Sequence, residues 1–116
     1  MAKRTKAVAQ PYQIRISKKA FLHISEITHY IGFEQQSPLH AGKVGNAIYA
    51  TIKRIAENPL YYQECKYILT KAKMYRQAIC LSWFIIYKIT VTEIIILGVL
   101  PQANHPSKFK ALRKVK

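Results

Sequence analysis

The chain has 116 residues and carries 19 Lys and Arg against 5 acidic residues, which gives a formal net charge of +14. This length supports one domain of about 100–150 residues and excludes a multidomain enzyme. Half of the residues are hydrophobic, which excludes a disordered polycation. The acids are single glutamates scattered along the chain. We therefore expect a compact basic domain without a carboxylate-rich active site, a bound metal or a cofactor.

The cysteines and the apolar runs bear on the cellular compartment. Cys65 and Cys80 are too few for a disulfide framework and lack the spacing of zinc ligands, so we expect two free thiols. The first ten residues lack the run of about 7–15 apolar residues that a signal peptide contains. Residues 83–100 are largely apolar, but two charges interrupt them and β-branched residues abound, which favours two strands over a membrane helix. The sequence predicts a cytoplasmic protein without membrane contact.

Three regions are expected along the chain. Residues 1–11 carry three cations and little to bury, so we expect a flexible basic arm. Residues 12–106 are expected to form a single folded domain. Residues 107–116 are expected to form a basic C-terminal tail of which few side chains are buried. Within the domain, residues 12–17 alternate apolar and polar side chains, the pattern of a half-buried strand.

Two helices are predicted after this strand. Ser17 is a good N-cap, and apolar residues then recur at steps of three and four up to Gly32, where the helix is expected to end. Ser37 and Pro38 start a second helix, because proline has no N–H to leave unpaired in the first turn. The pair Asn-Pro at 58–59 ends it. The short link between the helices predicts an antiparallel helical hairpin.

The second half of the chain predicts strands. Residues 60–73 hold no period for long, and residues 66–69 are expected to pair as a short strand. Three β-rich runs follow at 75–81, 83–90 and 94–100, and they predict an antiparallel meander. The run at 94–97 is apolar on both faces, so this strand is expected to be the most buried. The predicted class is α+β: an N-terminal strand, an antiparallel helical hairpin, then a three-stranded antiparallel meander.

This order of elements, with the length and the charge, resembles the RelE/ParE family of bacterial toxins from type II toxin–antitoxin systems. The resemblance covers residues 12–109 and is strongest at 75–76 (Tyr-Arg), 84–89 (Phe-Ile-Ile-Tyr-Lys-Ile) and 94–99 (Ile-Ile-Ile-Leu-Gly-Val); the other segments that carry it are 12–20, 27–31 and 52–59. It implies a toxin of the plasmid-stabilisation kind. It also implies a cognate antitoxin with an acidic segment, through which alone the toxin would reach operator DNA.

Two departures from the family pattern bear on the mechanism. RelE-like members cut messenger RNA on the ribosome with a set of cationic residues. Here Phe84 replaces the arginine usual on that strand, and residues 101–104 (Pro-Gln-Ala-Asn) replace a second basic cluster. An apolar ring cannot stabilise the charge that develops on a phosphate during cleavage. We therefore expect the ParE-like branch, whose members poison DNA gyrase by binding, and a chain that is not an enzyme.

Two alternatives stay open at this point. One is a RelE-like, ribosome-dependent messenger RNA endoribonuclease, for which the candidate catalytic residues are Arg76, Tyr87, Lys88 and His105. The other is a non-toxic basic nucleic-acid-binding protein of the same fold. The candidate partner-binding residues are cations and apolar strand residues: Arg76, Trp83, Phe84, Ile86, Lys108, Lys110, Arg113 and Lys114.

The alternation of the strand at 83–90 divides its side chains between two faces. Trp83 and Tyr87 share one face and are expected to pack under the helices. Phe84 and Ile86 lie on the other face. Because a large exposed apolar surface marks an interface, we expect an antitoxin or a second copy to cover that face.

Overall fold

The computed structural model of the protein describes residues 12–116, so the arm expected at residues 1–11 lies outside the described residues. The elements are β1 (Gln13–Ile16), α1 (Lys18–His29), a π-helical turn η2 (Tyr30–Glu34), α2 (Pro38–Glu57), β2 (Tyr75–Cys80), β3 (Trp83–Ile89), β4 (Glu93–Pro101), α3 (Pro106–Ala111) and a 3-10 turn η3 (Leu112–Lys114). A strand, a helical hairpin and three antiparallel strands follow one another, which confirms the predicted α+β fold.

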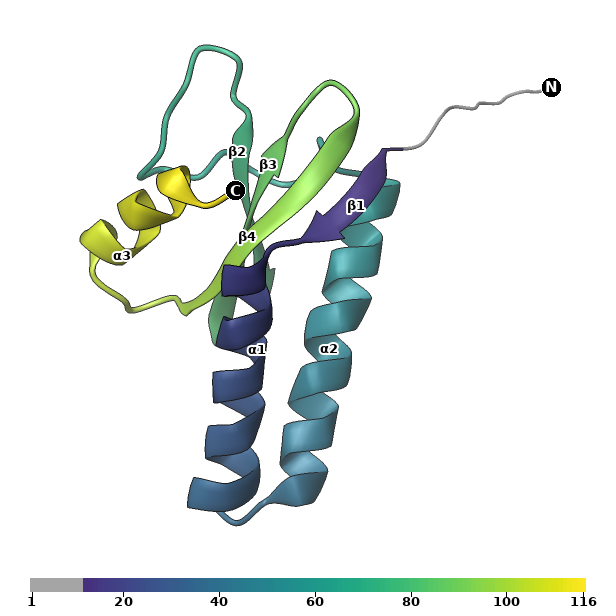
Figure 1. The fold of residues 1–116 in the computed structure, drawn as a ribbon, viewed down its shortest axis with the longest axis vertical. Coiled ribbons are helices and arrows are strands. Elements are labelled where there is room, and N and C mark those ends of the chain that lie inside the picture. Colours follow the sequence, from purple (N-terminus) through teal and green to yellow (C-terminus); the bar gives the residue numbers. More distant parts are fainter. Residues whose placement is uncertain (1–11) are drawn as a thin grey trace, which may run out of the picture.

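The four strands form one sheet in the order β1-β4-β3-β2 (Figure 1). β2 pairs with β3, and β3 with β4, in antiparallel register. β1 pairs with β4 in parallel, with Ile14 opposite Ile94. β4 is therefore an interior strand, and Ile94, Ile96 and Leu97 are completely buried. This confirms the prediction that it is the most buried strand.

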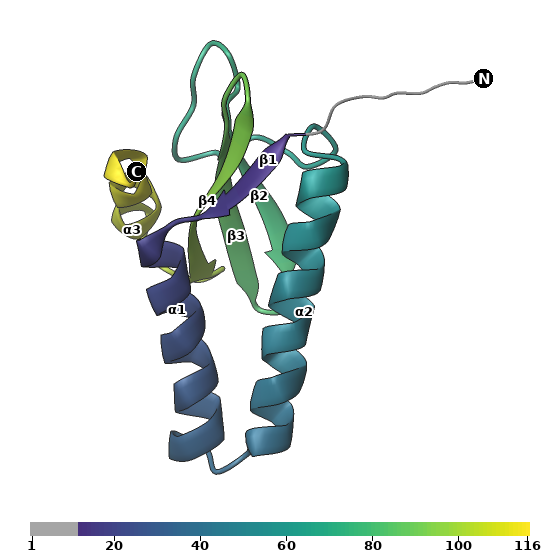
Figure 2. The ribbon, with the colours of Figure 1, turned by 45° about the vertical axis from the view of Figure 1, so that its right-hand side comes forward.

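The helical hairpin covers one face of the sheet (Figure 2). Its apolar stripe packs on alternate residues of the strands, among them Ile85 and Tyr87. Ser17 caps α1 as predicted, because its Oγ accepts the Ala20 N–H at 3.1 Å. α1 ends at His29, but the chain continues through η2, beyond the end expected at Gly32.

The C-terminal segment and residues 65–68 cover the second face of the sheet. Phe109 and Leu112 are buried in a core cluster with Ile86 and Leu97, and the Phe84 ring lies 6.0 Å from the Phe109 ring. The expectation that a partner covers this face is therefore wrong for Ile86, which the chain itself buries completely, while Phe84 is half-buried against Phe109. Few residues of the basic tail are buried, as expected, but the two that are, Phe109 and Leu112, anchor the segment in the core.

Residues 66–69 do not form the expected strand. The segment before them touches the edge of β2 through one bridge, Glu64 with Arg76, and through the Cys65 N–H, which donates to the Tyr75 carbonyl at 2.8 Å. Ile68 is buried in the second core cluster. Because Ile68 must be buried, the chain leaves the sheet edge after the bridge and packs on the face of the sheet.

Two further expectations concern thiols and membranes. Cys65 and Cys80 are free, as expected, and both are buried. Burial raises the pKa of the Cys65 thiol. Among residues 12–116, no helix has the length and apolar character needed to span a membrane.

Gly98 determines how closely α1 approaches β4. A Cβ on Gly98 would lie 3.0 Å from the His23 ring and 2.9 Å from Leu112, closer than side chains pack. Without it, the His23 ring reaches the strand, and its Nδ1 accepts the Val99 N–H at 3.0 Å. Burial, with a smaller contribution from the charge of Lys19, lowers the pKa of His23. The neutral imidazole is thus the form that fits the fold.

The buried C-terminal residues lead to a stability prediction. Phe109→Ala should lower the free energy of unfolding by about 3–5 kcal/mol, because a fully buried ring leaves a cavity, and deletion of residues 108–116 should abolish cooperative unfolding. Urea denaturation followed by circular dichroism measures both effects. The exposed neighbour Lys110, changed to Ala, is the matched control and should leave the midpoint unchanged. A truncated chain that still unfolds cooperatively would contradict the role of this segment.

The environment of His23 predicts a dependence of stability on pH. Because the pKa of His23 is lowered in the folded state, the unfolded chain takes up a proton on His23 at a higher pH than the folded chain does. The stability that the neutral His23 contributes is therefore fully present above about pH 6.5, the ordinary pKa of histidine, and falls as the pH decreases. His23→Asn keeps an acceptor near the position of Nδ1 and does not titrate. Between about pH 7.5 and pH 5.5 it should lose less stability than the wild type. Equal losses in the two proteins, measured by urea denaturation, would show that His23 is not responsible.

Candidate functional site

The four candidate catalytic residues are not assembled at one place. Arg76 and Tyr87 are opposite one another on β2 and β3 and lie on the face that the helical hairpin covers. Lys88 lies on the other face, where its Nζ is 5.6 Å from the centre of the Tyr75 ring. His105 precedes α3, beyond the opposite end of β3. This arrangement offers no position from which one substrate could contact all four residues.

Tyr87 is inaccessible to a substrate. Its side chain is completely buried, and its hydroxyl donates to the Pro59 carbonyl. The Tyr62 ring packs edge-on against it at 6.3 Å. Burial raises the pKa of Tyr87, and the nearby Arg76 charge offsets this only in part. A buried phenol that holds its proton so tightly secures the end of α2 and cannot serve as a base.

Arg76 ties the 60–73 segment to the sheet. Its Nε donates to the Lys73 carbonyl at 3.1 Å, and its Nη1 donates to the carbonyls of Leu60 at 3.2 Å and Tyr62 at 2.8 Å. The guanidinium thus binds carbonyls from both ends of the segment. The structure gives Arg76 a stabilising role, which the sequence did not indicate.

His105 forms the N-terminal cap of α3. Its Nδ1 accepts the Ser107 N–H at 3.1 Å and lies 2.9 Å from the Ser107 Oγ. The pattern at the sequence level is a His-Pro-Ser start followed by Phe109 and Leu112, three residues apart. Read as a helical repeat, this spacing could have revealed α3.

The candidate partner-binding residues divide into covered and exposed groups. Ile86 is completely buried and Phe84 is half-buried against Phe109. Trp83 is half-buried at the end of β3. The exposed members are the cations Lys108, Lys110, Arg113 and Lys114. Arg76 is half-buried as well. The four cations are therefore the fully exposed candidates, Arg76, Trp83 and Phe84 keep part of their surface, and Ile86 presents none to a partner.

A groove of about 530 Å³ lies between α1 and the C-terminal segment, over the end of β4. Sequence reasoning did not find it, because it exists only where α3 packs beside α1. We call it the α1–α3 groove. Its residues are Lys19, His23, Glu26, Ile27, Tyr30 and Ile31 from the hairpin, Trp83, Val99, Leu100 and Pro101 from the sheet, and Asn104, Lys108, Ala111 and Leu112 from the C-terminal segment.

Two groups of exposed apolar side chains lie at the tip of the helical hairpin and at the end of an edge strand. Phe33 and Leu39, 72% and 76% exposed, lie at the tip of the helical hairpin. Ile79 and Leu81 are exposed at the end of the edge strand β2, and Leu81 holds a positive φ of 55°. Exposed apolar clusters of this kind mark protein interfaces. We call them the hairpin tip and the β2 edge.

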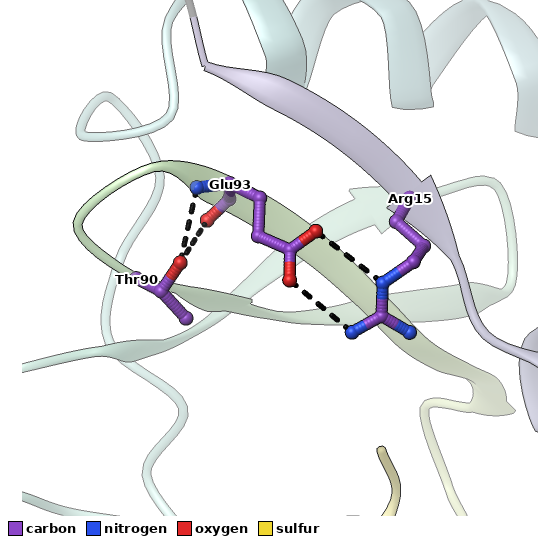
Figure 3. A network of polar contacts seen from close by, with 3 residues as sticks. All are labelled: Arg15, Thr90 and Glu93. Atoms are coloured by element: carbon purple, nitrogen blue, oxygen red, sulfur yellow. Dashed lines mark hydrogen bonds and ion pairs between the residues drawn. The ribbon is translucent and has the colours of Figure 1, made fainter.

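The cations of the surface are largely without acidic partners. Among residues 12–116, one ion pair forms, between Arg15 and Glu93, with two contacts of 3.3 Å (Figure 3). Thr90 orders the same corner, since its Oγ1 accepts the Glu93 N–H at 3.0 Å (Figure 3). This pair joins β1 to the start of β4 and is far along the chain from the C-terminal cations. The remaining positive charge is therefore available to an anionic partner.

The contacts of Arg76 predict a structural defect when it is removed. Arg76→Ala should lower the free energy of unfolding by about 1–3 kcal/mol, because three carbonyls lose a charged donor. Arg76→Lys should recover part of the loss, since a lysine can reach fewer of the carbonyls. Lys71→Ala, in the same segment, is the control and should behave as the wild type in urea denaturation. Wild-type stability in Arg76→Ala would refute the anchoring role.

Comparison with known proteins identifies the family of this chain. The family model for the ParE toxin of the type II toxin–antitoxin system parDE matches residues 14–106. Among curated proteins, no relative matches the chain. A solved structure of the chromosomal ParDE TA system from P. aeruginosa is similar with a TM-score of 0.61 and 16% identity, over 78% of this chain and 95% of that chain. At this identity the likeness shows the fold. The family match covers most of the sequence, and the chain therefore belongs to the ParE toxin family of type II toxin–antitoxin systems.

Proposed function

We propose that this toxin acts by binding and inhibiting DNA gyrase and does not cleave RNA. The observation that carries the proposal is the position of the residues that RNA cleavage would have to use. Tyr87 is buried on a backbone carbonyl, Arg76 is bound to three carbonyls, and Lys88 lies on the opposite face of the sheet.

The chemistry of RNA cleavage supports the same choice. Cleavage requires an accessible base and cations grouped around one phosphate. Where the RelE-like pattern has an arginine, Phe84 packs on Phe109. Where that pattern has a second basic cluster, residues 101–104 form a turn, in which the Asn104 N–H donates to the Pro101 carbonyl at 3.0 Å. Neither position carries a cation that could stabilise a phosphate during cleavage.

A cognate antitoxin is the expected inhibitor, as for a type II system. The excess of cations over acids favours an antitoxin with an acidic segment. The hairpin tip and the β2 edge offer the apolar surface that such a segment needs in order to fold on binding. In this proposal the toxin works in the cytoplasm and reaches operator sequences only through the antitoxin.

The experiment pairs a supercoiling assay with a map of RNA cleavage. Purified toxin should inhibit gyrase in a supercoiling assay, and the antitoxin encoded beside it should restore the activity. Primer extension on messages from cells that express the toxin should show no codon-phased cuts.

The variant Tyr87→Phe separates the two mechanisms. It removes the phenolic proton and one buried hydrogen bond, so a binding toxin should keep its inhibition of gyrase once the variant is shown to be folded. A ribonuclease that used this tyrosine would lose its cuts. Codon-phased cuts that vanish in Tyr87→Phe, with supercoiling unaffected, would overturn the proposal.

A further inference from the structure

Six exposed cations lie on the C-terminal segment or on the segments that pack beside it. They are Lys19 of α1, Lys66 of the segment before β2, Lys108 and Lys110 of α3, and Arg113 and Lys114 of η3. Lys19 and Lys108 line the α1–α3 groove. On the other side of α3, Lys110 and Arg113 line a notch of about 290 Å³ together with residues 67–69. We call these six residues the cation band.

The packing beneath the band fixes its parts relative to one another. Lys66 Nζ lies 5.1 Å from the centre of the Tyr67 ring, and that ring lies 5.1 Å from the Phe109 ring. Phe109 and Leu112 anchor α3 and η3 in the core. Both views show α3 beside the start of α1 (Figures 1 and 2). The charges therefore sit on a rigid support.

Few acidic groups oppose these charges. Glu26 lines the α1–α3 groove with Lys19 and Lys108. Glu64 lies near Lys66 in sequence, but one of its carboxylate oxygens accepts the Thr70 N–H at 3.1 Å. The one ion pair among the described residues, Arg15 with Glu93, lies outside the band. A rigid, uncompensated group of cations attracts polyanions.

The side chains between the cations distinguish a phosphate polymer from a protein. The outward residues of α3 and η3 are cations, Ser107 and the small Ala111, and the strongly exposed apolar side chain that lines the notch is Leu69. Protein interfaces have apolar cores depleted in lysine, whereas interfaces with nucleic acid are polar and positively charged. Other exposed apolar side chains lie outside α3 and η3, among them Phe21 and Leu22 on α1 and the residues of the hairpin tip and the β2 edge.

On the notch side of α3, where Lys110 and Arg113 lie, the aromatic side chains favour a duplex over a single strand. The exposed Tyr30 lines the α1–α3 groove, on the other side of α3. Single-stranded nucleic acid binds to exposed aromatic rings on which its bases stack. Tyr67, the aromatic residue of the notch, is half-buried between Lys66 and Phe109 and offers no such platform. Contacts with phosphates alone bind a duplex without reading its sequence.

We propose that the cation band binds the phosphate backbone of duplex DNA directly and without sequence preference. This goes beyond inhibition of gyrase and does not depend on it. It also differs from recognition of operator sequences through the antitoxin, because no base is read.

The test measures binding of the full chain to a labelled duplex of about 20 base pairs of random sequence, by fluorescence anisotropy over a series of salt concentrations. The band variant is Lys110→Gln/Arg113→Gln/Lys114→Gln. The matched control is Lys43→Gln/Lys53→Gln/Arg54→Gln on α2, which removes the same number of exposed charges. Thermal unfolding verifies that both variants are folded.

The expected result is a specific loss in the band variant. About one unit of the slope of log affinity against log salt is lost per phosphate contact removed, so the slope should fall by about 2–3. Affinity at about 50 mM salt should fall at least tenfold, while the control should stay within about twofold of the wild type.

Four results would overturn the proposal. Equal losses in the two variants would show that total charge alone attracts DNA, and no loss in either would place the contact elsewhere. Tighter binding to single-stranded RNA of the same length would reject the duplex. Tighter binding to a glutamate-rich peptide of equal charge, dependent on the same three residues, would assign the band to a protein partner.

Discussion

The burial of β4 on both faces is the constraint on which the rest of the fold depends. Ile94 and Ile96 face the helical hairpin, while Ile95 and Leu97 face the other way. A strand of this kind must be covered on both sides. The hairpin supplies one cover, and the short segment that carries Phe109 and Leu112 supplies much of the second. A highly charged end of the chain is thereby fixed in the core, and its cations are held in place.

Local signals explain why much of the fold could be predicted. Ser17 marks a helix start because its side chain caps the first turn, and Pro38 marks another because its missing N–H costs nothing there; both signals involve only neighbouring residues. The alternation along β3 placed Trp83 and Tyr87 on the hairpin side and Phe84 and Ile86 on the other, as the structure confirms. The parallel pairing of β1 with β4 carries no local signal, because the partners are far apart in sequence.

The site was less predictable because its residues act through distant backbone. Nothing beside Arg76 in sequence indicates that its guanidinium binds the carbonyls of Leu60 and Tyr62. The groove beside α1 depends on the position of α3, and high charge made the C-terminal segment resemble a solvated tail. Two apolar residues at helical spacing, Phe109 and Leu112, outweigh that charge energetically, since each is completely buried.

The parallel contact between β1 and β4 also has a consequence for synthesis. The Ser17 hydroxyl donates to the Leu97 carbonyl, 80 residues later in the chain. β1 and both hairpin helices leave the ribosome well before β4 has been synthesised. Until β4 is available, no strand pairing can offset the entropy cost of bringing such distant residues together. Phe109 and Leu112 follow later still. The sheet therefore cannot be completed until β4 has left the ribosome, and its second face is covered only after Phe109 and Leu112 have followed.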